Sequence, residues 1–272
     1  MSARSRLSRP LSRREAAGAL AGAALGAAAL VRGGSASAAA QAPAPPSGER
    51  VTLTLSDGAE VAALLHRPAN GAPAPGVLLL PEWWGLTDAV AAAAADLAAR
   101  GYAALAVDLT HGRRPTTPEA ARALIDGLDP ARTREALIGW TDWLARGPAA
   151  GEPVGALGWG FGGGWALATA LAAPLAACVV YYGRVNRPTA ELAALQGPVL
   201  GHFAERDPFI DRAMVADFIA ATAAAGGALT VYWYDADHAF ANPADPAYDA
   251  EAAARAWDRT TSFLDQALKA DA

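Results

Sequence analysis

Short runs of continuous apolar residues alternate with longer stretches of helical spacing along most of the chain. The apolar runs predict strands that are buried on both faces, and the longer stretches predict the helices between them. The predicted strands cover residues 51–56, 61–66, 76–80, 103–107, 154–158, 176–181, 199–203 and 229–234. The predicted helices cover residues 88–100, 117–127, 130–146, 161–172, 212–225 and 247–268. This alternation predicts an α/β fold with a mostly parallel central sheet and helices on both faces.

Residues 1–40 differ from the rest of the chain in charge and composition. They carry six arginines and one acidic residue, and the pair Arg13-Arg14 precedes an apolar, alanine-rich stretch. This order predicts an export signal of the twin-arginine type, and hence a periplasmic or extracellular protein. A disordered tail or an uncleaved anchor is the alternative. The proline-rich residues 41–50 are expected to form a flexible lead-in to a single domain over residues 51–272.

The remainder of the chain is acidic, with 16 basic and 26 acidic side chains in residues 41–272. Such a balance disfavours nucleic acid and anionic lipid, so we expect no nucleic-acid partner and no stable membrane association after signal removal. The single cysteine, Cys178, lies in an apolar run and is expected to fill the core. The four histidines lack the spacing of metal ligands, so neither a metal nor another cofactor is expected.

Five polar or conformationally special residues fall just after predicted strands. Because the carboxyl ends of parallel strands meet at one edge of a sheet, these residues are expected to share one rim, where ligands bind in such folds. They are Glu82, Asp108, Gly160, Asp207 and His238.

Gly160 lies in the segment Gly158-Trp159-Gly160-Phe161-Gly162, between a predicted strand and a predicted helix. A glycine-flanked turn from strand to helix is typical of the nucleophile elbow of α/β-hydrolases, where a serine or cysteine stands between the glycines. Asp207 and His238 follow in the chain order of a catalytic triad. The sequence therefore predicts an α/β-hydrolase fold that has the acid and the base but a glycine at the nucleophile position.

Taken together, these motifs resemble the dienelactone hydrolase family (carboxymethylenebutenolidase-like), small α/β-hydrolases that open lactones and esters with a Cys-His-Asp triad. The resemblance covers nearly all of residues 51–268, and it depends on the order and spacing of several short segments. The matching segments are residues 81–86, 106–109, 158–164, 200–207 and 237–240.

The resemblance implies a role for each matching residue. Asp207 corresponds to the acid that orients the histidine, and His238 to the general base. Glu82 corresponds to the family's glutamate, which takes part in activating the thiol. The backbone N–H groups of Trp83 and Phe161 take the positions of the oxyanion hole.

The chain departs from the family pattern in two places. Gly160 replaces the cysteine, and Thr110-His111-Gly112 replaces a stretch that usually contains a tyrosine. The family's substrate-binding arginine is therefore placed at Arg113 or Arg114. Trp84 and Trp159 are expected to contribute to the substrate pocket as wall residues.

Three functions follow from these residues, and the first is the leading interpretation. In the first, His238, oriented by Asp207, activates water toward a lactone or ester carbonyl that the Trp83 and Phe161 amides hold. In the second, the protein is inactive and binds a small carbonyl ligand. In the third, His238 and Glu82 transfer protons in a reaction such as an isomerisation.

Overall fold

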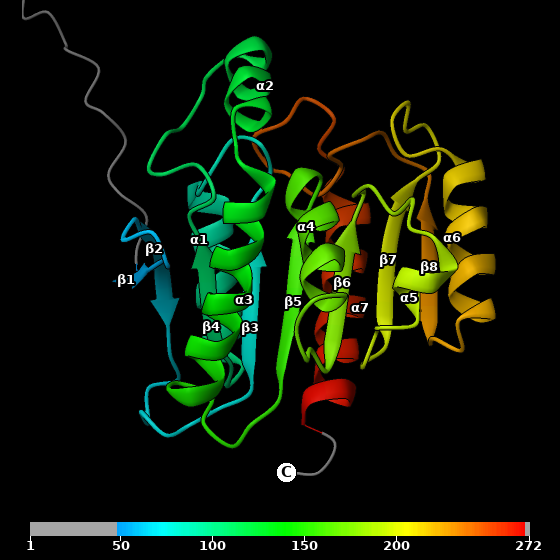
Figure 1. Cartoon of the computed structure of the whole chain (residues 1–272). Coiled ribbons are helices and arrows are strands. Elements are labelled where there is room, and N and C mark those ends of the chain that lie inside the picture. Colours follow the sequence, from blue (N-terminus) through cyan, green and yellow to red (C-terminus); the bar gives the residue numbers. More distant parts are fainter. Residues whose placement is uncertain (1–47, 270–272) are drawn as a thin grey trace, which may run out of the picture. The chain divides into compact units, whose positions relative to one another are not determined.

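In the computed structural model, which describes residues 48–269, the strands form one eight-stranded sheet (Figure 1). Its spatial order is β1-β2-β4-β3-β5-β6-β7-β8, with antiparallel pairing of β1 with β2 and of β2 with β4, and parallel pairing elsewhere. The strands are β1 (Glu49–Thr54), β2 (Glu60–His66), β3 (Gly76–Leu80), β4 (Ala103–Val107), β5 (Val154–Trp159), β6 (Ala177–Tyr181), β7 (Val199–Ala204) and β8 (Leu229–Tyr234).

Helices cover both faces of this sheet (Figure 1). Helices α1 (Asp88–Ala99) and α7 (Ala250–Leu268) pack on one face, where Leu97 and Leu264 are fully buried. The other face is covered by α3 (Pro130–Arg146), α4 (Phe161–Ala170) and α6 (Arg212–Ala224). The two remaining helices are α2 (Pro118–Asp126) and the single turn α5 (Thr189–Leu192).

Side-chain caps fix where most of the long helices begin. The Asp129 carboxylate accepts hydrogen bonds from the first backbone N–H groups of α3, and Asp211 and Asp249 cap α6 and α7 in the same way. These bonds satisfy donors that have no partner within the helix. Helix α4 has no such cap, because Gly160 stands at its cap position. The first N–H groups of α4 are therefore left for another acceptor.

The strand order places one pair of loops at the centre of the fold. Strands β3 and β5 are neighbours, but the chain leaves β3 toward β4 and leaves β5 toward β6, on opposite sides. Ligands bind at such a switch point in open α/β sheets, because the loops diverge there. Glu82 follows β3 and Gly160 follows β5, so the two residues flank this opening.

The observed sheet and helices confirm the predicted fold class, and the only helix missing from the prediction within residues 48–269 is the four-residue α5. Most of the expected lead-in lies outside the described residues, but its last two residues, Glu49 and Arg50, belong to β1 and pair with β2. The expected export signal also lies outside them. None of the helices in residues 48–269 combines the length and apolarity needed to cross a bilayer.

Candidate active site

Gly160 forms a sharp turn between β5 and α4. Its backbone has φ of 50° and ψ of −113°, a left-handed conformation that glycine adopts most easily. Two backbone bonds hold this turn: Gly160 N–H donates to the Tyr181 carbonyl at 2.9 Å, and Gly164 N–H donates to the Gly160 carbonyl at 3.2 Å. The segment thus has the strand-turn-helix geometry of a nucleophile elbow.

The glycines around this turn differ in what surrounds them. A Cβ on Gly162 would stand 2.1 Å from the Leu80 carbonyl oxygen, and one on Gly158 would stand 2.2 Å from the Gly162 oxygen. Only glycine allows α4 to approach β3 and β5 so closely. At Gly160 the nearest atoms to an added Cβ would be Glu82 Cγ at 3.7 Å and His238 Nε2 at 3.9 Å. The nucleophile position therefore has room for a side chain.

Asp207 and His238 form a hydrogen-bonded pair beside this turn. His238 Nδ1 lies 2.7 Å from Asp207 Oδ2, and the aspartate side chain is 1% exposed. Asp207 Oδ1 accepts bonds from the backbone N–H groups of Phe209 and Ile210 at 2.8 and 3.0 Å. A carboxylate only accepts, so Nδ1 carries the proton and Nε2 is left as the acceptor. Nε2 is the ring atom that faces Gly160.

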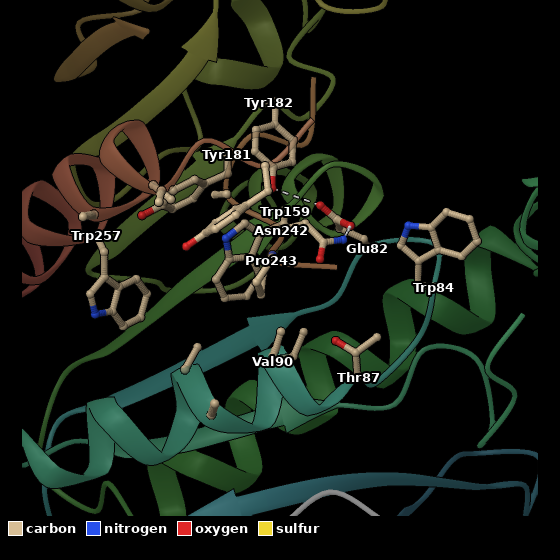
Figure 2. Close-up of a pocket in the computed structure, with 18 of the residues that line it drawn as sticks. Glu82, Trp84, Thr87, Val90, Trp159, Tyr181, Tyr182, Asn242, Pro243 and Trp257 are labelled. Carbon is tan, nitrogen blue, oxygen red and sulfur yellow. Dashed lines mark hydrogen bonds between the residues drawn. The ribbon is translucent and has the colours of Figure 1, made fainter. Parts of the chain in front are cut away.

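Glu82 is the third titratable group at the turn (Figure 2). Its Oε1 accepts a bond from the Tyr182 hydroxyl at 3.0 Å, and its Oε2 accepts one from Asn242 Nδ2 at 2.6 Å. Burial is the main cause that raises the pKa of Glu82 from 4.5 to about 7, against the lowering effect of these two bonds and of His238. Both protonation states are therefore populated near neutral pH.

The predicted oxyanion hole consists of two backbone donors at the cavity wall. The N–H groups of Trp83 and Phe161 bond to no other group within residues 48–269, and both residues line a cavity of about 790 Å³ together with Gly160 and His238. We call this space the triad cavity. Unpaired N–H groups beside the base are what stabilisation of a developing oxyanion requires.

Comparison with known proteins shows the family of the chain. The model of the dienelactone hydrolase family matches residues 61–268. The chain belongs to this family. It is 30% identical over 227 residues to a carboxymethylenebutenolidase of Pseudomonas putida, covering 79% of this chain and 95% of the relative. A carboxymethylenebutenolidase of Rhodococcus opacus is 28% identical over 240 residues, covering 83% and 95%.

Solved structures agree with this assignment. A dienelactone hydrolase-like promiscuous phosphotriesterase from metagenomic libraries superposes with a TM-score of 0.73 at 27% identity, over 81% of this chain and 98% of that one. A thermophilic esterase from Thermogutta terrifontis superposes with a TM-score of 0.60 at 17% identity, over 81% and 94%. The second match shows the fold alone. The chain thus has the α/β-hydrolase fold of the dienelactone hydrolase family.

The structure places Asp108 and both candidate arginines, Arg113 and Arg114, away from the triad cavity. Arg113 Nε donates to the Thr110 carbonyl, and Arg114 binds the Leu86 carbonyl and Asp88, so neither lines the cavity. Asp108 accepts bonds from the Thr110 and Gly112 N–H groups, which shapes the loop after β4. The Thr110 carbonyl thus holds the Arg113 side chain in that loop, outside the triad cavity, so the expected substrate contact at Arg113 stays a prediction.

Other arginines line the triad cavity instead. They come from α2, α3 and the loop after β6: Arg122, Arg134, Arg184 and Arg187. No ion pair or side-chain hydrogen bond to another described residue engages Arg134 or Arg184. The triad cavity is thus lined by four arginines, of which Arg122 pairs with Asp126 and Arg187 with Glu191. Sequence reasoning missed them because their elements meet only in the folded chain.

Sequence reasoning also missed Tyr182 and Asn242, the two partners of Glu82. In the sequence, Tyr182 continues the apolar run of β6 and gives no separate signal. In the structure, its φ of 36° marks it as a strained non-glycine residue. Asn242 lies in an irregular segment before α7. Of the predicted pocket residues, Trp84 lines the triad cavity and Trp159 lines a neighbouring one. Within residues 48–269, no group of His, Cys, Asp or Glu side chains has a metal-binding arrangement.

Proposed function

We propose that the protein hydrolyses lactone or ester bonds with a water molecule that His238 activates. One observation carries the proposal: His238 Nε2 faces the space over Gly160, where a Cβ would stand 3.9 Å away. A water molecule in this space would lie within hydrogen-bond reach of Nε2 and beside the Trp83 and Phe161 amides. The names of the carboxymethylenebutenolidases among the relatives support a lactone as the substrate.

The proposed reaction needs no covalent intermediate with the protein. The water oxygen attacks the carbonyl carbon while its proton moves to His238 Nε2, and Asp207 stabilises the imidazolium that forms. The Trp83 and Phe161 N–H groups hold the negative carbonyl oxygen. When the carbon–oxygen bond to the leaving group breaks, the proton on Nε2 moves to the leaving oxygen. The products are a carboxylic acid and an alcohol, or one hydroxy acid from a lactone.

The test compares wild type with His238→Ala on p-nitrophenyl acetate and on a small enol-lactone. Loss of a general base typically costs about 10² to 10⁴ in rate, so kcat/KM should fall at least about 100-fold. The matched control is His111→Asn, because His111 is an exposed histidine in left-handed backbone outside the triad cavity, a conformation that asparagine tolerates. Equal rates in wild type and His238→Ala would overturn the proposal.

A second candidate function is ligand binding without turnover, and Gly160 is the observation that favours it. With no side chain at the elbow, the triad cavity could hold a carbonyl ligand between the two amides and His238. This reading predicts that a small lactone raises the melting temperature of the protein and is recovered intact. Consumption of the same lactone, lost in His238→Ala, would decide for the hydrolase.

A further inference from the structure

A second cavity of about 340 Å³ lies on the α1 and α7 side of the site (Figure 2). Glu82 and Trp84 stand at one end of it, and Trp257 stands at the other. The remaining wall includes six alanines that α1 and α7 supply and four aromatic residues: Ala89, Ala92, Ala93, Ala250, Ala253, Ala254, Trp159, Tyr181, Tyr182 and Tyr248. We call it the alanine cavity. It adjoins the triad cavity, because Glu82, Trp84 and Tyr182 line both.

The two cavities differ in charge. Four arginines line the triad cavity, whereas Glu82 is the only charged side chain among the described residues that line the alanine cavity. The other polar groups in its wall are uncharged: the side chains of Thr87 and Asn242, the indole N–H groups and the tyrosine hydroxyls, of which the Tyr182 hydroxyl already donates to Glu82. An anion in this space would meet a carboxyl group and apolar walls and would have no cation to pair with. The lining therefore suits an uncharged, mostly apolar group that has at most one polar end.

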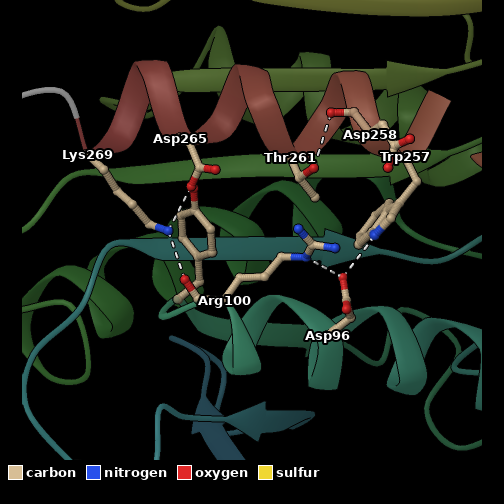
Figure 3. Close-up of polar contacts among 8 residues, drawn as sticks. Asp96, Arg100, Trp257, Asp258, Thr261, Asp265 and Lys269 are labelled. Carbon is tan, nitrogen blue, oxygen red and sulfur yellow. Dashed lines mark hydrogen bonds and ion pairs between the residues drawn. The ribbon is translucent and has the colours of Figure 1, made fainter. Parts of the chain in front are cut away.

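Hydrogen bonds connect α1 and α7 at the far end of the alanine cavity (Figure 3). Trp257 Nε1 on α7 donates to Asp96 Oδ2 on α1 at 2.9 Å, and Arg100 Nε donates to the same carboxylate at 2.7 Å. Lys269 Nζ, just after α7, donates to the Arg100 carbonyl at 2.8 Å. The bonds from Trp257 and Lys269 connect α7 with α1, and they favour the present spacing of the two helices before a ligand arrives.

We propose that the alanine cavity binds the uncharged, apolar arm of the substrate while the carbonyl lies in the triad cavity. The proposal extends the proposed hydrolase function by naming the substrate class, an ester or lactone that carries a neutral alkyl or aryl arm. Each water molecule takes up about 30 Å³ of the liquid, so the cavity has the volume of about eleven water molecules. An arm of about ten non-hydrogen atoms therefore fits in it. Glu82 and Asn242 stand where the arm would meet the reacting carbonyl.

Binding is tested with acetophenone, a neutral aromatic ketone that has no bond to hydrolyse. Titration calorimetry on wild type should show binding, and Ala93→Leu, which fills the cavity from α1, should weaken it at least tenfold. Ala99→Leu is the matched control, because Ala99 is exposed on the same helix and does not line the cavity. It should change the Kd less than twofold. No binding by wild type, or equal binding by Ala93→Leu, would overturn the proposal.

Charge selectivity is tested with 4-acetylbenzoate, which adds one carboxylate to the same ketone. Both compounds compete with labelled acetophenone for the cavity. We expect 4-acetylbenzoate to displace the label only at a concentration at least tenfold higher than that of unlabelled acetophenone. Displacement at equal concentration would contradict a site for uncharged groups. The arginines of the triad cavity can bind the carboxylate separately, so the displacement of acetophenone, rather than total binding, is the readout.

Failure of this proposal can be told apart from failure of the proposed hydrolysis. Acetophenone binding is also measured in His238→Ala, where the Ala93→Leu effect should persist even if no protein hydrolyses esters. If wild type does hydrolyse esters, kcat/KM is also compared between a 4-phenylbutyrate ester and an acetate ester. Ala93→Leu should lower the preference for the 4-phenylbutyrate ester at least tenfold. An unchanged preference would mean that the cavity does not hold the substrate's arm.

Discussion

The elbow and the acid–base pair lie side by side, yet only the acid–base pair has the reactive side chains of a catalytic triad. Around Asp207 and His238, both the reactive side chains and the bonds that orient them are present. At the elbow, the backbone path, the flanking glycines and the room for a side chain are present, but Gly160 supplies no reactive atom. The difference separates what the fold requires from what the chemistry requires.

The flanking glycines belong to the fold, because backbone carbonyls leave no space for a Cβ at Gly158 or Gly162. Gly160 is different, because the atoms around it are side chains at van der Waals distance. A change at the flanking positions should therefore affect stability, and a change at Gly160 should affect reactivity. Each of the following predictions tests one side of this comparison.

The largest effect is expected at Gly162. In Gly162→Ala the new methyl group would stand 2.1 Å from the Leu80 carbonyl oxygen, so β3 and α4 would have to separate. Overpacking against rigid backbone should cost more than about 3 kcal/mol of unfolding free energy, or prevent folding altogether. Urea denaturation and the soluble yield measure this.

Gly164→Ala is the control for that change. Its Cβ would meet nothing closer than 3.6 Å, and it lies within the same helix, so the substitution should be neutral or add up to about 1 kcal/mol. Equal stability of the two variants would mean that the elbow is not tightly packed and that the comparison is wrong.

The next effect is a gain of activity at Gly160. In Gly160→Cys the thiol would lie between Glu82 and His238, which stand 3.7 and 3.9 Å from the new Cβ. Loss of a triad member costs about 10⁶ in kcat in a well-studied protease, so restoring one should raise kcat/KM for p-nitrophenyl acetate at least about 100-fold. A burst of p-nitrophenol in stopped-flow measurements would show the acyl-enzyme.

Gly160→Ala separates the thiol from the backbone change. Both variants place a Cβ in left-handed backbone, which costs about 1 to 2 kcal/mol, so their stabilities should match. Only the cysteine variant should gain activity. If neither gains, the base and the amides do not converge on a carbonyl held at the elbow, and the acid–base pair has lost its catalytic geometry.

The two sides of the comparison also differ in how far the sequence predicts them. Apolar runs and glycine spacing predict the strands and the elbow, because both depend on local backbone and burial. Asp207 and His238 follow from their order along the chain. Asn242 could not be predicted as a partner of Glu82, because a contact across 160 positions depends on loop conformation. For a similar reason, the sequence could not predict that Arg184 lines the triad cavity or that the Thr110 carbonyl holds Arg113.

The last prediction concerns Glu82, which lies beside Gly160 at the elbow and interacts with His238 of the acid–base pair. Its pKa rises from 4.5 to about 7 in the folded protein, chiefly because of burial. The folded state therefore favours the protonated acid. The contribution of Glu82 to the unfolding free energy is complete below pH 4.5. It is lost as the pH rises through 7, which lowers the unfolding free energy by up to about 3 kcal/mol. The unfolding free energy of wild type, measured in urea, should fall between pH 5 and pH 8 relative to that of Glu82→Gln.

The comparison between the two proteins isolates this group, because every other titration is common to both. Glu119→Gln serves as the control, since Glu119 is exposed in the first turn of α2 and should leave the pH dependence of wild type unchanged. Parallel curves for wild type and Glu82→Gln would contradict the raised pKa. Glu82 would then be ionised throughout this range, and it could not donate a proton to a substrate at neutral pH. The leaving group would still receive its proton from His238, as the proposed hydrolysis requires, but a proton transfer by Glu82 in an isomerisation would lose its support.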